Sequence, residues 1–252
     1  VKIIWYEVDK DEDSVKIFTR LNIGKISLTN AELVKALFLS RGRKDDKGRY
    51  SGNPYGINDK DQHEIALTWD SMEKELHDEN FWAFITNEKA EKYPIRMELL
   101  FNMIETEEEQ NNSFATFNSF YKRFKDSDDK IEVWGTIVRY FQQLQEWYKD
   151  FDLYHQIGFL VAFGTSVKDL LEMSMNKESP MKKSEFRDTI LTQIREIMTF
   201  RKKIPNGEGE IIDYDDLNYE AHPEWIKMVL LLFNVETIRQ KGDRNSRFPF
   251  DS

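Results

Sequence analysis

The chain has 252 residues, including 36 Lys and Arg against 46 Asp and Glu, and it contains no cysteine. A chain of this length can bury about three quarters of the surface that its unfolded form exposes, so it needs no disulfide to fold, and the lack of cysteine excludes disulfides and thiolate metal sites. The net charge of −10 repels a polyanion at long range and therefore argues against a stand-alone DNA-binding module.

Residues 1–9 are predicted to form a strand, because Val, Ile, Trp and Tyr are frequent in them, and a helix is predicted from about Ser14. A lone strand requires a partner strand. Because the chain opens with Val inside this strand, we expect the sequence to be a fragment of a longer protein. The strand would then be left from a truncated α/β domain.

The residue pattern over positions 17–39 predicts a helix, a turn and a second helix. Asn22 and Gly24 tolerate the left-handed conformation that ends a helix, and Gly24 is expected to have a positive φ. Thr29 and Glu32 have the spacing of a capping box, in which each side chain bonds the backbone amide of the other residue. The second helix should therefore begin just after Thr29, and its apolar residues Leu33, Ala36 and Leu37 recur at helical spacing.

Residues 41–60 contain four glycines and a proline without periodicity, which predicts a loop. Its first part carries five basic side chains against two acidic ones, a local charge of +3 inside a chain of −10. The basic residues are Arg41, Arg43, Lys44, Lys47 and Arg49. A basic loop can contact DNA phosphates, but such charge runs are more often solvated loops, and both interpretations stay open.

From about Asp59 onward apolar residues recur at helical spacing, first as the stripe Ile65, Trp69, Met72 and Leu76. Helices are expected around residues 81–85, 97–104 and 114–124, and over residues 128–149, 152–163, 166–176, 183–203 and 223–240. The fold class is therefore mainly α, a multi-helix bundle with one short N-terminal β-strand. We expect one domain over residues 1–60 and a helical domain over residues 61–252, with a possible sub-boundary near residues 176–182.

No catalytic or metal-binding residue is predicted. The four histidines, His63, His77, His155 and His222, share no ligand spacing. The chain also lacks the Gly-Lys-Ser/Thr ending of a phosphate-binding P-loop.

One run of residues resembles a known family. Its residues are Phe18, Arg20, Leu21, Asn22, Gly24, Lys25, Leu28, Thr29, Glu32 and Leu33. Together with the preceding strand, this run resembles the C-terminal half of the ParB-like domain in GmrSD-type, modification-dependent restriction endonucleases. The resemblance continues more loosely through Trp69, the Phe81-Trp82 pair, residues 230–234 and the closing Phe248-Pro249-Phe250.

The resemblance implies a nucleotide-hydrolysing domain whose Asp-Gly-Gln-Gln-Arg motif would precede Val1, and an HNH nuclease domain beyond the other end. No cofactor is then expected in this fragment, whereas the parent protein would use a nucleoside triphosphate and a divalent metal. Its partners would be the missing N-terminal and C-terminal domains of the same chain, and DNA through the parent protein. Arg20, Asn22 and Lys25 are the candidate nucleotide-binding residues; alternatively, Asn22 caps a helix and the two basic residues are surface charges.

The expected function is a helical scaffold that completes a nucleotide-binding domain, connects it to a nuclease domain and is inert in isolation. A complete helical protein-binding module and an unrecognised enzyme are the alternatives. The longest apolar run, Met228 to Phe233, is far shorter than the roughly 20 residues of a membrane span. We therefore expect a cytoplasmic protein that has no membrane partner.

Overall fold

The computed structural model describes residues 28–41, 52–104, 113–176, 179, 181–202, 210–244 and 246–251. This part of the chain is mainly helical, as predicted. The predicted N-terminal strand and the turn at Gly24 lie outside the described residues.

The described α-helices are α2 (Asn30–Leu39), α3 (Asp59–Leu76), α4 (Glu79–Ile85), α5 (Met97–Ile104), α6 (Ala115–Asp126), α7 (Lys130–Lys149), α8 (Phe151–Ala162), α9 (Val167–Ser174), α10 (Lys183–Ile197) and α11 (Pro223–Gln240). Two 3-10 helices are η1 (Ala90–Lys92) and η2 (Tyr214–Asp216). The strands β1 (Arg201–Lys202) and β2 (Glu210–Ile211) pair antiparallel, with Arg201 opposite Ile211.

The capping box at the start of α2 is confirmed. The Thr29 hydroxyl accepts from the Glu32 amide at 3.2 Å, and the Thr29 amide donates to the Glu32 carboxylate at 2.8 Å. At the other end of α2, the side-chain amides of Asn53 and Gln62 donate to the Phe38 carbonyl at 3.0 and 2.9 Å. These bonds satisfy a carbonyl that the helix itself leaves without a partner, and they attach the start of α3 to the end of α2.

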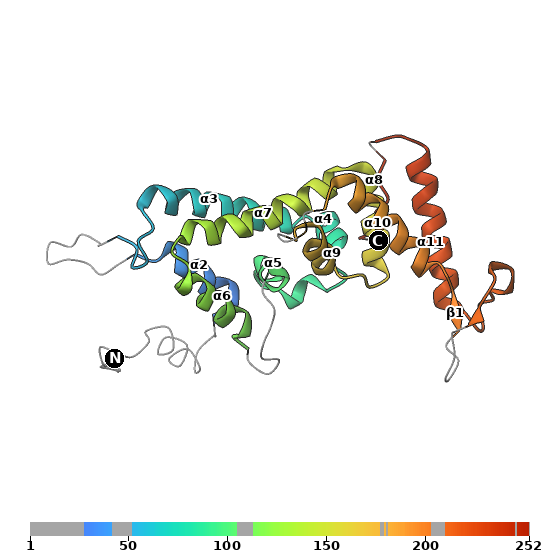
Figure 1. Cartoon of the computed structure of the whole chain (residues 1–252), viewed down its shortest axis with the longest axis horizontal. Helices are drawn as coiled ribbons and strands as arrows, with labels where there is room; N and C mark the ends of the chain where they lie inside the picture. The colour runs from blue at the N-terminus through green and yellow to red at the C-terminus, as the bar shows by residue number, and fades with distance from the viewer. Residues whose placement is uncertain are drawn as a thin grey trace.

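The helices form an elongated molecule in which α3 and α7 lie side by side, and α2 and α6 pack against each other at one end (Figure 1). Aromatic side chains fill the space between them. The ring of Phe38, which is fully buried, lies 5.1 Å from Phe124 and 5.4 Å from Trp134. Trp134 in turn stacks on Trp69 of α3 at 6.2 Å. These aromatic residues therefore form the core of this half of the molecule.

Helix α8 lies at the centre of the other end of the molecule, because it packs against α4, α7, α10 and α11. Residues 153–161 are all buried, including the polar His155 and Gln156. A helix that is apolar on nearly every side is typical of an interior position. The predicted range 152–163 agrees with α8 to within one residue at each end.

The predicted helix over residues 183–203 is too long, since α10 ends at Ile197. The chain leaves the helix there so that the Phe200 ring stacks on Trp225 of α11 at 5.1 Å. The Phe200 carbonyl accepts from the Ile212 amide at 2.9 Å, next to the β1–β2 pair. Packing against a distant segment thus overrides the helical spacing of Phe200, and the sequence did not predict this strand pair.

Candidate functional site

Asp150 joins α7 to α8 and is at once the C-cap of the first helix and the N-cap of the second. Its side chain accepts from the Leu153 amide at 3.1 Å. A carboxylate is favourable at this position because it accepts from an otherwise unpaired amide and lies at the positive end of the helix dipole. This one side chain therefore satisfies the first turn of α8 at the corner between the two helices.

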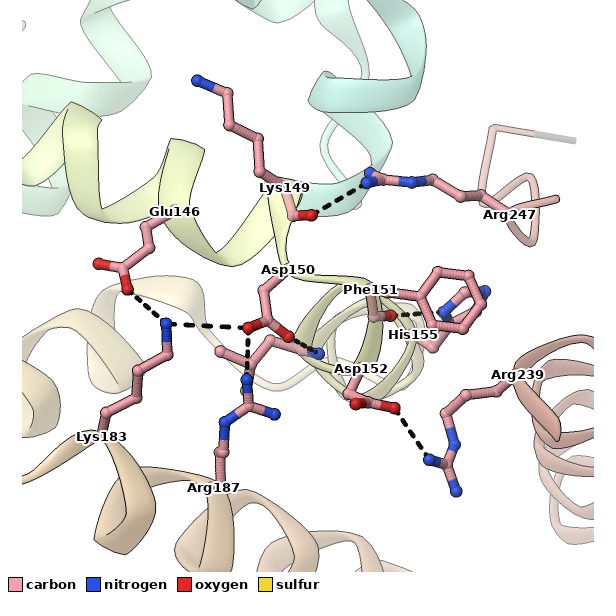
Figure 2. Close-up of polar contacts among 11 residues, drawn as sticks. Glu146, Lys149, Asp150, Phe151, Asp152, His155, Lys183, Arg187, Arg239 and Arg247 are labelled. Atoms are coloured by element: carbon pink, nitrogen blue, oxygen red, sulfur yellow. Dashed lines mark hydrogen bonds and ion pairs between the residues drawn. The ribbon is translucent and has the colours of Figure 1, made fainter. Parts of the chain in front are cut away.

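The same carboxylate attaches α10. Arg187 donates to the second oxygen of Asp150, and the Lys183 ammonium lies 3.8 Å from that oxygen and 2.7 Å from Glu146 (Figure 2). Close to these ion pairs, the Trp147 ring stacks on Phe186 at 4.9 Å. Helix α10 is thus attached by a partly buried cluster of charges beside one aromatic pair.

Asp152 attaches α11 on the other side of the same helical turn. Its carboxylate accepts from Arg239 at 2.9 Å (Figure 2). Arg239 is also bonded to Glu236 at 2.7 Å. The hydrogen bonds to Glu236 raise the pKa of Arg239 further above its already high value. The two carboxylates at the start of α8 therefore hold α10 and α11 separately.

A third element bound here is the C-terminal segment, residues 246–251. The Arg247 guanidinium donates to the Tyr148 carbonyl at 2.5 Å and to the Lys149 carbonyl at 3.1 Å. It also lies 5.3 Å from the Tyr148 ring and 4.9 Å from the Tyr154 ring. Arg247 therefore caps the carbonyl end of α7, where a cation is favourable, and is held by cation–π contacts.

The backbone of Phe248 is bound by two side chains of α8. The Tyr154 hydroxyl donates to the Phe248 carbonyl at 2.7 Å, and the Phe248 amide donates to His155 Nε2 at 3.2 Å. Burial raises the pKa of Tyr154 and lowers that of His155, so the phenol keeps its proton and the imidazole is neutral near pH 7. Both groups are therefore in the protonation state that these bonds need.

Phe250 packs where α8 has no side chain. A Cβ atom added at Gly158 would lie 2.2 Å from the Phe250 ring. The ring also lies 5.5 Å from Tyr154 and 5.0 Å from Phe248. Only glycine allows the ring to approach α8 this closely. Together, the arginine cap, the two backbone bonds and the ring over Gly158 bind a polypeptide segment at a defined register.

Most of the site residues predicted from the sequence cannot be compared with this geometry. Arg20, Asn22 and Lys25 lie outside the described residues, as do Arg43, Lys44, Lys47 and Arg49. Arg41 is described and exposed. In the described ranges, no group of three or more His, Asp or Glu side chains could hold a metal ion.

The residues that bind the C-terminal segment were not predicted as a site. Phe248-Pro249-Phe250 stood out only through the family resemblance, without a role. His155 had no ligand spacing, and nothing in the sequence connects it to Phe248, 93 residues later. The helical glycine at position 158 was the signal that sequence reasoning could have used, because a glycine inside a helix that is otherwise apolar often marks a close contact.

A cavity of about 410 Å³ lies elsewhere, between α4, α5 and the start of α9. Its charged side chains are bonded within the protein. Lys92 lies 2.5 Å from Glu88, which also accepts from Tyr93 at 2.9 Å, and Lys168 donates to the Asn102 carbonyl at 3.3 Å. The cavity therefore presents no set of groups that selects one class of ligand.

None of the helices in the described ranges is both long enough and apolar enough to cross a membrane. The chain was also compared with known proteins. It matches no protein-family model, no curated protein and no solved structure.

Proposed function

We propose that this chain is the helical scaffold of a restriction-endonuclease-like protein. In this proposal the chain completes a ParB-like nucleotide-binding domain at its N-terminal end and connects it to a nuclease domain that follows residue 252. The family proposal rests on the resemblance of residues 17–33 and on the looser match that reaches Phe248-Pro249-Phe250. The parent protein would use a nucleoside triphosphate and a divalent metal and act on DNA.

The observation that carries the scaffold role is the binding of residues 247–250 to the end of α7 and to α8. A scaffold must hold a following domain in a defined position, and a segment bound through its backbone, one guanidinium and one partly buried ring meets this need. The long paired helices α3 and α7 form a body that can keep two domains apart (Figure 1).

The test compares this chain with the same chain extended by its neighbouring sequence at both ends. Nucleotide hydrolysis and DNA cleavage are measured for each protein. We expect both activities in the extended protein and neither in the 252-residue chain. Activity of the shorter chain alone would contradict the proposal and support an enzyme that the sequence does not reveal.

A matched pair of variants then tests the scaffold role in the extended protein. Gly158→Ala should displace the Phe250 ring and reduce nucleotide-dependent DNA cleavage at least tenfold, while nucleotide hydrolysis persists. Gly135→Ala in α7 is the control, because its Cβ would meet only the flexible ends of Arg139 and Glu132, at 3.4 and 3.6 Å. Equal cleavage by both variants would show that the bound segment does not position the nuclease.

DNA contact by the basic loop remains a separate proposal, motivated by its charge of +3 within a chain of −10. Its test replaces Arg41, Arg43, Lys44 and Arg49 together in the extended protein. If the loop binds phosphates, DNA affinity and the steepness of its salt dependence should both fall, since fewer counterions are released. If neither the DNA affinity nor its salt dependence changes, the loop is a solvated connector that does not contact DNA.

A protein-binding module is the alternative function, and the outer face of α11 favours it. Leu230 and Phe233 on this helix are 49% and 70% exposed. Exposed apolar residues that cluster on one face mark interaction sites more often than isolated ones do.

A further inference from the structure

His155 binds the C-terminal segment in one tautomer only. Its Nδ1 atom lies 2.7 Å from the Phe151 carbonyl, which can only accept, so Nδ1 carries the proton. Its Nε2 atom accepts from the Phe248 amide at 3.2 Å, so Nε2 carries none. The two ring nitrogens thus have opposite roles, and both are used.

A second proton on the imidazole would lie on Nε2 and face the N–H group of Phe248. Two donors would then point at each other inside the protein, where leaving a polar group unpaired is unfavourable. His155 has no exposed surface, so water has no direct access to the imidazolium at its present position. The favourable response is for the segment to move away and admit solvent.

The surrounding charges act in the same direction. Arg247 on the segment and Arg239 on α11 both disfavour the imidazolium, whereas Asp152 on α8 favours it. Asp152 is already bonded to Arg239. The neighbouring Tyr154 is influenced by Asp78 and Asp251 but stays neutral because it is buried. On the α10 side, Lys183 and Arg187 are engaged by Asp150.

We infer that protonation of His155 releases the C-terminal segment from α8 while the helical body stays folded. We expect the release to be local because the core around Phe38 and Trp134 is built from uncharged aromatic rings. The Phe151 carbonyl keeps its donor in the protonated state, so α8 itself is not disturbed. The inference concerns how the segment is attached and does not depend on the function of the parent protein.

Nuclear magnetic resonance on the 252-residue chain tests this directly between pH 7.5 and pH 5. The ring nitrogens of His155 report its tautomer and titration, and hydrogen exchange of the Phe248 amide, corrected for the intrinsic pH effect, reports attachment. We expect the neutral Nδ1–H tautomer at pH 7.5. The protection of Phe248 should then fall at least tenfold along the titration curve of His155, while core amides such as that of Ile157 keep theirs.

Two variants separate this inference from general acid unfolding. His155→Gln removes the titrating group, so attachment of the segment, whether strong or weak, should no longer change between pH 7.5 and pH 5. His77→Gln is the matched control at an exposed histidine on α3's C-cap, and it should behave as the wild type does. If His155 titrates without loss of Phe248 protection, or if the core amides lose protection on the same curve, the inference is wrong.

Discussion

The body formed by α2, α3, α6 and α7 and the region formed by α10 and α11 are held together in different ways. Phe38 of α2 is fully buried, and its ring contacts those of Phe120, Phe124 and Trp134. Helix α11 is longer than α2 but has one buried residue, Val235. Its link to α8 includes an ion pair of Arg239.

Exposed apolar residues show the same contrast. Of the seven large hydrophobic residues that are exposed in the described part of the chain, five lie between residues 211 and 233. They are Ile211, Tyr214, Tyr219, Leu230 and Phe233. Apolar burial therefore dominates in the body, whereas at α10 and α11 ion pairs to the start of α8 act beside a smaller set of buried residues such as Phe186 and Ile190. Substitutions in the two regions should accordingly differ in size and in what they disturb.

The largest effect is expected for Phe38→Ala. Removing a fully buried aromatic ring that contacts three others leaves a cavity, and the free energy of unfolding should fall by about 3–5 kcal/mol. Denaturant unfolding measures the change. Phe38→Leu keeps part of the volume and should cost clearly less, so equal losses for the two variants would contradict the cavity explanation.

Asp150→Ala should have the next largest effect, about 2 kcal/mol, because it removes a helix N-cap together with two ion pairs. Hydrogen exchange should show the loss mainly in α10 and the first turn of α8. Asp70→Ala is the control, because Asp70 is exposed and pairs only with Lys35 in the described structure. If exchange increases equally throughout the body, α10 is not held by Asp150 in the way described.

These examples also show what could be predicted from the sequence. Helix α3 was predicted from the spacing of Ile65, Trp69, Met72 and Leu76, and all four are buried. Spacing within a helix is local information. The end of α10 was wrong because Phe200 continues the helical spacing, and its stacking on Trp225 depends on a segment 25 residues later.

The site at the start of α8 was harder to predict for the same reason. Asp150 has the sequence position of an N-cap, but its bonds to Lys183 and Arg187 join residues more than 30 positions apart. His155 and Gly158 have their roles only once Phe248 and Phe250 are folded back onto α8. Local patterns therefore predicted the helices, whereas the contacts that give the site its chemistry come from the tertiary fold.

Thr29→Ala should destabilise the body by about 1 kcal/mol, the usual cost of losing a helix N-cap. Glu32 can still accept from the Thr29 backbone amide in this variant, so only one half of the capping box is lost. Thermal or denaturant unfolding measures the change. Thr68→Ala in α3 is the matched control, since the Thr68 hydroxyl donates to the carbonyl of Glu64 within its own helix and alanine favours the helix. A Thr29 variant no less stable than the Thr68 variant would show that the cap contributes nothing.

The smallest effect is expected for Phe233→Ser on α11. Phe233 is as large as Phe38, but it is 70% exposed, and surface substitutions usually change the free energy of unfolding by no more than about 0.5 kcal/mol. The pair Phe38 and Phe233 thus compares one side-chain type in the two regions.

Unfolding should be measured at two protein concentrations at least tenfold apart, because a second copy covering α11 would make stability depend on concentration. A loss above about 1 kcal/mol that appears only at the higher concentration would show that the outer face of α11 is covered by self-association. The same loss at both concentrations would instead show that Phe233 packs within its own chain, and the contrast between the two regions would be smaller than the exposures indicate.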